Sequence, residues 1–186
     1  MAKIIKKVFI LTMICLVFVS CASMKSKHYA GEKSPVFDGE MQGECIWQFE
    51  DRVFHVHPID SSTAVVSSLE WDKTQKRYNE KKATISLSAF KEDEFYFLNL
   101  KLENEGVYTI FRIIGATNEK DFILFTVDAK TIERHMKAGK VKASKKGNDY
   151  ILDLAKKELD AYVKENLNEL FNHDIAGIIR RIHCKE

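Results

Sequence analysis

About seven short segments with a two-residue hydrophobic period lie between residues 45 and 127, and this pattern restricts the fold more than any other feature. In the clearest segment, Ile85, Leu87 and Ala89 alternate with hydroxyl side chains, which is typical of a half-buried strand. No helical pattern separates the segments, so we expect a mainly β fold built as an antiparallel meander. Because only one face of such a sheet is apolar, the sheet is expected to curl or to close into a barrel. The predicted strands are 45–49, 52–57, 64–71, 85–89, 95–102, 107–114 and 122–127.

Two strongly charged stretches are expected to be connections rather than regular elements. Residues 72–82 contain many lysines and acids and are predicted to form a long exposed connection. Residues 140–146 are rich in lysine and are predicted to form a loop.

The hydrophobic period changes after residue 127. Asp128 is expected to cap a short helix that runs to Lys137, with Gly139 as its stop. A longer helix over 155–172 is predicted to pack on the sheet or to plug the barrel mouth. Its apolar stripe consists of Leu159, Tyr162, Val163, Leu167, Leu170 and Phe171.

Residues 175–182 fit two structures. Four isoleucines at helical spacing favour a helix, whereas the run Ile178-Ile179-Arg180-Arg181-Ile182 also suits a closing strand. A closing strand would lie beside the first strand and would bring Cys184 near Cys45.

The N-terminus has the features of a secretory signal peptide over residues 1–20. Three lysines precede an apolar run from Val8 to Val19, and small residues follow. The apolar run is shorter than the ~20 residues that a helix needs to cross a bilayer. The alternatives are plain secretion and a retained membrane anchor.

The tetrapeptide Phe18-Val19-Ser20-Cys21 resembles the bacterial lipobox, with Phe where Leu is usual. The resemblance implies that Cys21 becomes the lipidated, palmitate-carrying N-terminus of a membrane-anchored envelope lipoprotein. In a Gram-negative host, the resemblance implies the periplasmic face of the outer membrane. The polar stretch 21–39 is expected to be a flexible tether, and 40–186 a single β-rich domain.

Charge and cysteine content narrow the possible partners. Removal of the signal takes three of the 29 basic residues and leaves 26 against 27 acidic ones, so no nucleic-acid partner is expected. Cys45 and Cys184 remain as an even pair in an oxidising compartment, and we expect a disulfide. The alternative is two unpaired thiols.

The order of a glycine and a tryptophan near the first strand, a meander and a C-terminal helix resembles lipocalins. Here Gly43 precedes Trp47 by four residues, whereas lipocalins have Gly-x-Trp. The chain also resembles envelope lipoproteins of no assigned activity whose final helix contains Glu-Leu-x-x-Tyr, here Glu158 to Tyr162.

Four aromatic residues are candidates for the lining of an apolar cavity. Trp47, Phe49, Phe54 and Tyr96 are expected to face the barrel interior. Small barrels either hold one ligand or fill the interior with side chains. The first case predicts binding of an apolar small molecule or lipid, and the second predicts a solid core.

His55 and His57 are candidates for a metal site. At positions i and i+2 of a strand they lie on one face, and histidine is a common ligand of first-row metals. Their face is opposite Phe54 and Val56, so the alternative is two solvated histidines without a third ligand.

Neither an enzyme nor a cofactor is expected. Glu44, Glu50, Glu70 and Asp72 are the acids nearest to the first strands, and turn acids are normally solvated. The sequence lacks nucleophile elbows, phosphate loops and His-Glu-x-x-His helices. Five clustered lysines can meet anionic headgroups or form a solvated loop, namely Lys137, Lys140, Lys142, Lys145 and Lys146.

The function expected from these features is that of a lipid-anchored, non-enzymatic binding module. The first hypothesis is an apolar ligand in the barrel. The second is an envelope protein partner, recognised by the surface of a structural lipoprotein with a filled core.

Overall fold

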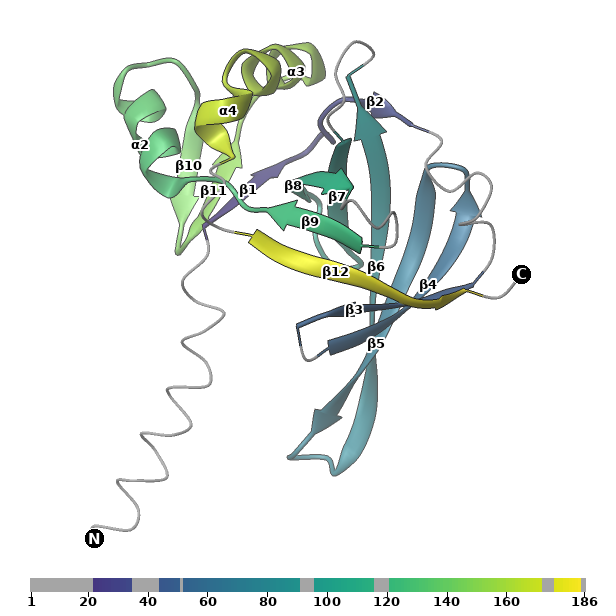
Figure 1. Cartoon of the computed structure of the whole chain (residues 1–186). Coiled ribbons are helices and arrows are strands. Elements are labelled where there is room, and N and C mark those ends of the chain that lie inside the picture. Colours follow the sequence, from purple (N-terminus) through teal and green to yellow (C-terminus); the bar gives the residue numbers. More distant parts are fainter. Residues whose placement is uncertain are drawn as a thin grey trace, which may run out of the picture.

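The computed structural model describes residues 22–34, 44–50, 52–90, 96–115, 121–171 and 176–184. Within them, a continuous sheet of twelve strands closes into a barrel and carries three helices at one side (Figure 1). None of these three helices is both long and apolar enough to cross a bilayer.

Eight antiparallel strands form the closed barrel. Six follow in chain order, each paired with the next: β3 (Cys45–Phe49), β4 (Arg52–Asp60), β5 (Thr63–Asp72), β6 (Arg77–Ala89), β7 (Tyr96–Leu102) and β8 (Tyr108–Gly115). β9 (Asp121–Phe125) pairs with β8, and β12 (Ala176–Cys184) pairs with both β9 and β3 to complete the ring. The predicted mainly β fold, with its meander curled into a barrel, is confirmed.

The segment for which helix and strand were both open is the closing strand. β12 runs antiparallel to β3, and a register shift between Arg181 and His183 places Cys184 opposite Cys45. Opposed residues of antiparallel strands have Cα atoms about 4.5–5.5 Å apart, which is within the range that a disulfide spans. The register therefore agrees with the predicted disulfide, which stays a prediction.

Side chains from all eight strands meet inside the barrel. They form one apolar cluster, which comprises Cys45, Trp47, Val56, Ala64, Ile85, Leu87, Leu98, Ile113, Leu124 and Ile179. Because side chains alternate between the faces of a strand, residues next to these in the sequence face the outside of the barrel.

The sheet continues beyond the barrel at β8. One edge of β8 pairs with β9 over residues 112–115 and with β1 (Ser23–Ser26) over residues 108–110. β1 is followed by β11 (Asp149–Leu152) in parallel, and β11 by β10 (Ala143–Lys146). This three-stranded extension supports the helices (Figure 1).

The prediction of a flexible tether over 21–39 is wrong for residues 22–34. Met24 and Ala30 are fully buried, and β2 (Glu32–Lys33) pairs with β6. The backbone N–H of Ala30 donates to Asn99 Oδ1 at 3.0 Å. Main-chain pairing and contacts with distant side chains hold this stretch, so its own polar composition did not reveal it. The folded domain therefore begins near residue 22 rather than at 40.

Gly31 makes the bend before β2, within this stretch, possible. Its φ is +75°, a region that favours glycine, and an added Cβ would lie 3.0 Å from the carbonyl oxygen of Ala89. The N–H of Gly31 donates to Asp160 Oδ1 at 2.9 Å, and its carbonyl accepts from Lys156 Nζ at 2.7 Å. The N-terminal segment is thereby fastened to the last long helix.

The helices begin where the sequence predicts; the first also ends at the predicted residue, Lys137, whereas the second is divided in two. α2 (Ala129–Lys137) is capped by Asp128, whose carboxylate accepts from the N–H groups of Lys130 and Thr131. The helix expected over 155–172 consists of α3 (Lys156–Glu165) and α4 (Leu167–Leu170), separated at Asn166. The amide of Asn166 donates to the carbonyl of Tyr162 at 2.8 Å.

The helices cover the outer face of the sheet and do not plug the barrel. Phe97 of β7 alternates with the barrel residue Leu98 and packs with the helices in a second apolar cluster. The other buried members of this cluster are Met24, Ala30, Phe90, Ile110, Phe125, Val127, Ile132, Val141, Tyr150, Leu152, Leu159, Tyr162, Val163, Leu167, Leu170 and Phe171.

Both predicted connections contain hairpins. β5 and β6 continue to Asp72 and Arg77, so the expected connection 72–82 is mostly strand and projects from the barrel (Figure 1). The lysine-rich stretch contains β10, which pairs with β11. Cross-strand partners satisfy the backbone in both cases, and charged side chains alternate on exposed faces without disturbing the pairing.

Candidate functional site

The aromatic side chains expected to line a cavity do not share one environment. Trp47 is 4% exposed, and its ring lies 5.9 Å from that of Phe122 within the barrel core. Phe49 packs against the same core, and Phe54 is half-buried opposite Trp47. Tyr96 is 40% exposed at the start of β7. The structure therefore places Trp47 and Phe49 in packed core and leaves Tyr96 at the surface.

His55 and His57 lie on the outer face of β4, as predicted, and Glu44 lies between them. Glu44 Oε2 is 3.6 Å from His55 Nε2, and Glu44 Oε1 is 3.4 Å from His57 Nδ1. All three side chains are substantially exposed. In the part of the chain that the structure describes, no group of three or more His, Cys, Asp or Glu is arranged to hold a metal ion. The contacts are those of a surface ion-pair cluster.

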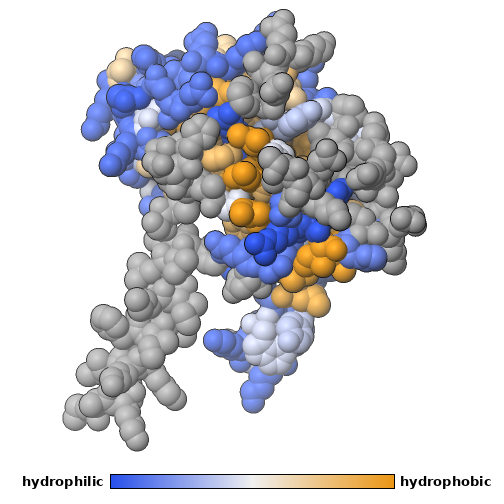
Figure 2. All heavy atoms as spheres, viewed as in Figure 1, coloured by the Kyte–Doolittle hydropathy of each residue, from blue (hydrophilic) through white to orange (hydrophobic). Residues whose placement is uncertain are grey.

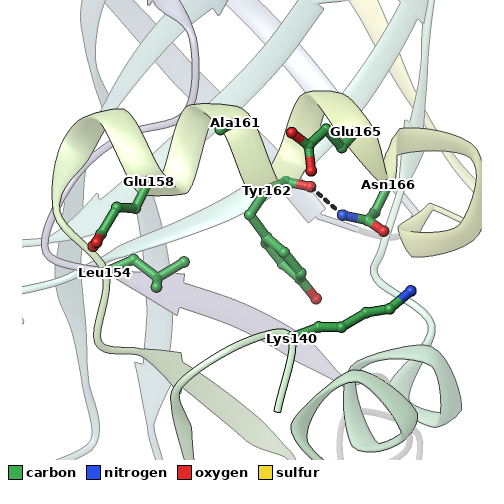
Figure 3. Close-up of a pocket in the computed structure, with 7 residues that line it drawn as sticks. All are labelled: Lys140, Leu154, Glu158, Ala161, Tyr162, Glu165 and Asn166. Carbon is green, nitrogen blue, oxygen red and sulfur yellow. Dashed lines mark hydrogen bonds between the residues drawn. The ribbon is translucent and has the colours of Figure 1, made fainter. Parts of the chain in front are cut away.

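A pocket of about 510 Å³ lies beside α3, outside the barrel. Its volume is within the range of small-molecule sites. In Figure 3, Tyr162 points from α3 towards the loop that carries Lys140, and Glu158 and Glu165 lie along the same helix. The full lining is Lys140, Leu154, Glu158, Ala161, Tyr162, Glu165 and Asn166. The pocket thus combines a basic group, two acids and a few apolar side chains.

Behind this pocket, a buried polar chain joins the three helices. Tyr162 of α3 lies with its hydroxyl 3.0 Å from Nδ1 of His135 on α2. Nε2 of His135 lies 3.4 Å from Glu169 of α4. His135 is 1% exposed. Among the described residues Nε2 has no hydrogen-bond partner, so Tyr162 supplies the side-chain hydrogen bond of this buried ring.

The electrostatics of this chain keep the phenol neutral. Burial raises the pKa of Tyr162 to about 12, and the negative charge of Glu169 acts in the same direction. A nucleophile or base needs a lowered pKa to lose its proton near neutral pH. The arrangement therefore orients a hydrogen-bond donor and connects the helices.

A second pocket of about 400 Å³ lies at the edge formed by β1 and β11. Lys25 lies within it, 3.1 Å from Glu105 and 3.0 Å from Asp149. Partial burial opposes the charge of Lys25, but hydrogen bonds and charges of the two acids outweigh it and raise its pKa. The charges in this pocket largely compensate one another.

The other acids and lysines considered above contact separate partners. Glu70 pairs with Arg52 at 3.7 Å, and Asp72 accepts N–H groups of its own turn. The backbone carbonyl of Glu50 accepts from Gln48. Lys145 pairs with Glu133 at 2.7 Å. These contacts are structural. The predicted lipid-attachment residue, Cys21, lies outside the described residues.

Comparison of the chain with protein-family models, with curated proteins and with solved structures finds no match. The likeness to lipocalins is therefore one of barrel architecture.

The sequence analysis named Glu44 but did not place it beside the two histidines, and it missed the contacts of His135 with Tyr162 and Glu169. Glu44 precedes the first strand, and only the pairing of β3 with β4 brings it beside both histidines. His135 carries a detectable signal, because it follows Ile132 by three residues on the apolar side of a predicted helix. A polar residue at such a position needs a buried partner.

Proposed function

We propose that this protein is a lipid-anchored, non-enzymatic binding protein of the bacterial cell envelope, and that its outer surface makes the contacts. The observation that carries the proposal is the interior of the barrel. Residues from all eight strands pack there as one apolar cluster around Trp47. A barrel with such an interior serves as a scaffold.

The anchor is supported by the sequence around Cys21 and by the start of the fold. Residues 1–20 have the pattern of a signal peptide, and β1 begins at Ser23, two residues after Cys21. Two residues span at most about 7 Å. A diacylglycerol on Cys21 would therefore hold β1 against the bilayer, with no long tether between them. In a Gram-negative host we place the protein at the periplasmic face of the outer membrane.

The packed barrel favours an envelope protein partner over an apolar molecule inside the barrel. Several apolar side chains remain exposed on β4 and β12, namely Val53 at 54%, Ile178 at 47% and Ile182 at 54%. Large exposed side chains that gather on one surface are typical of contact sites.

The test is isolation of the full chain from its own host after in vivo cross-linking. We expect the mass of the N-terminal peptide to show a diacylated Cys21, and we expect cross-linked envelope proteins. Cys21→Ser is the control and should abolish incorporation of labelled palmitate. A native mass spectrum with a stoichiometric apolar ligand and no cross-linked partner would overturn the surface-binding proposal in favour of the barrel-cavity hypothesis.

The pocket beside α3 favours a second candidate, a small zwitterionic ligand. Lys140 can pair with a carboxylate, and Glu158 and Glu165 can pair with an amine. Screening of amino acids and short peptides by isothermal calorimetry tests this candidate. Binding that Lys140→Ala removes and Lys142→Ala retains would support it. Equal loss in both variants would contradict it.

A further inference from the structure

The hairpin of β5 and β6 extends beyond the barrel wall. Within the described residues, the last pairs with neighbouring strands involve Ser67 and Ala83. Beyond them, five residue pairs join the two strands to each other, ending at Asp72 and Arg77. At ~3.4 Å per residue, the hairpin continues roughly 17 Å beyond its last pair with either neighbouring strand, and Figure 1 shows it projecting from the barrel.

One face of this projecting hairpin is apolar and exposed. Ala64 and Val66 belong to the barrel core, so Leu69 and Trp71 face outwards by alternation. Trp71 pairs across the hairpin with Tyr78, and their ring centroids are 4.9 Å apart. Leu69 is 68%, Trp71 50% and Tyr78 66% exposed. Figure 2 shows further hydrophobic side chains on the barrel surface next to the hairpin.

The hairpin that carries these rings has more basic than acidic residues. Between residues 69 and 82, five exposed basic residues outnumber three acids. The acids have local partners: Glu70 pairs with Arg52, Glu80 pairs with Lys82 at 3.0 Å, and Asp72 caps the turn. The five basic residues are Lys73, Lys76, Arg77, Lys81 and Lys82. Tryptophan and tyrosine beside basic groups suit the headgroup layer of an anionic membrane.

The start of β1 and the hairpin tip border one side of the molecule in Figure 1. Ser23 donates its N–H to the carbonyl of Asn148 at 3.2 Å, so β1 begins beside the turn between β10 and β11. That turn follows Lys145 and Lys146. In Figure 1, the start of β1, this turn and the hairpin tip all border the lower left side.

We infer that the β5–β6 hairpin is a second membrane contact, which inserts Leu69, Trp71 and Tyr78 among anionic lipid headgroups. The inference rests on the proposed anchoring through Cys21, which would hold this side of the domain at the bilayer. Amphipathic elements of this kind bind in the interface plane through apolar area and attraction to anionic lipid. Together, the anchor and the hairpin would fix the orientation of the domain relative to the membrane.

The experiment uses the mature chain, residues 21–186, with Cys21→Ser, so that the hairpin is tested without the signal peptide and without the acyl chains. Binding is measured by co-flotation with vesicles of phosphatidylcholine and phosphatidylglycerol, and insertion by quenching of tryptophan emission with brominated lipid. Trp47 is buried, so quenching reports on Trp71. We expect Trp71→Ser with Tyr78→Ser to weaken binding by at least about tenfold. Lys73→Glu with Lys76→Glu should weaken it several-fold on anionic vesicles alone.

The matched control is Ile59→Ser with Tyr96→Ser. These residues are 61% and 40% exposed, and they lie near the ends of β5 and β6 opposite the projecting turn. The control should bind vesicles as the parent does, and circular dichroism checks the fold of each variant.

Equal vesicle binding by the Trp71→Ser, Tyr78→Ser variant and by the Ile59→Ser, Tyr96→Ser control would overturn the inference. An emission spectrum that brominated lipid leaves unchanged would also overturn it. So would loss of a cross-linked envelope protein in the hairpin variant without any change in vesicle binding, because the hairpin would then be a protein-docking site. A wild-type protein that is diacylated at Cys21 but shows no quenching keeps the proposed anchoring and removes the hairpin contact. Quenching by brominated lipid in a protein whose Cys21 is not acylated in the host would keep the hairpin contact and remove the proposed anchoring.

Discussion

Asp60 illustrates how a short turn sets the charge of a single residue. Its carboxylate accepts from the backbone N–H of Ser62 at 2.8 Å and from the Ser62 hydroxyl at 2.9 Å. These bonds favour the ionised form and lower the pKa from 3.8 to about 2, with the backbone bond as the largest cause.

We expect NMR titration to find the Asp60 carboxyl midpoint near 2. The stabilisation is present above the unfolded pKa of 3.8 and is lost as the pH falls through the folded value of about 2. Ser62→Ala should raise the midpoint part of the way, because the hydroxyl bond disappears while the backbone bond remains. A wild-type midpoint near 4 would contradict the turn geometry.

The hydroxyl of Tyr162 on α3 forms a buried hydrogen bond with His135 on α2. Tyr162→Phe leaves Nδ1 of buried His135 without its hydroxyl partner, and we expect a loss of about 1–3 kcal/mol in the free energy of unfolding. Urea denaturation measures the loss. Tyr78→Phe, at an exposed tyrosine, is the control and should stay within about 0.5 kcal/mol. Equal effects in the two variants would show that the buried chain contributes nothing.

The same residue predicts a dependence on alkaline pH. Because the folded pKa of Tyr162 is raised from 10.0 to about 12, the folded state retains a proton that the unfolded state loses. The stabilisation is full below pH 10 and declines as the pH rises through about 12. Tyr162→Phe should remove this part of the alkaline decline.

Gly177 lies in the closing strand β12, where its lack of a side chain leaves room for the ring of Phe49. A Cβ at Gly177 would overlap the ring of Phe49, whereas a Cβ at Gly115 of β8 meets nothing within 4 Å. We expect Gly177→Ala to destabilise the fold by about 1–3 kcal/mol through overpacking. Gly115→Ala should be nearly neutral, since both glycines lie in strands. Thermal or urea unfolding of the two variants tests this, and a neutral Gly177→Ala would mean that Phe49 moves aside freely.

At the scale of elements, the sequence predicted those whose own side chains carry the period. α2 begins at Asp128, as the cap residue predicts. β1 and β10 were missed because their pairing is main-chain pairing with distant strands, and few of their side chains are apolar. The break at Asn166 was also missed, because the apolar stripe continues across it from α3 into α4.

At the scale of the whole molecule, Cys45 and Cys184 link the first and last barrel strands. We expect non-reducing peptide mapping of the exported protein to find them joined, and Cys45→Ser with Cys184→Ser to lower stability by up to about 5 kcal/mol. Reduction of the wild-type protein should have a similar effect and should leave the double variant unchanged. Alkylation of both thiols without prior reduction would refute the disulfide.

The candidate sites required the whole molecule. Trp47 and Phe49 were correctly expected to face inwards, but only the structure shows that they pack with residues of the other strands in one apolar cluster. The pocket beside α3 depends on Lys140 and Leu154 meeting a helix that follows them in the chain. Neither the packing around Trp47 nor the lining of this pocket can be inferred from a local sequence pattern.

By itself, the sequence determined the alternating strands and the capped helix at Asp128, because each depends on neighbours a few residues apart. The tertiary structure alone decided the closure by β12, the inclusion of residues 22–34 in the fold, the meeting of His135 with Tyr162 and Glu169, and the projection of the charged β5–β6 hairpin. These depend on contacts between distant segments, whose partners are fixed only when the ring of strands closes.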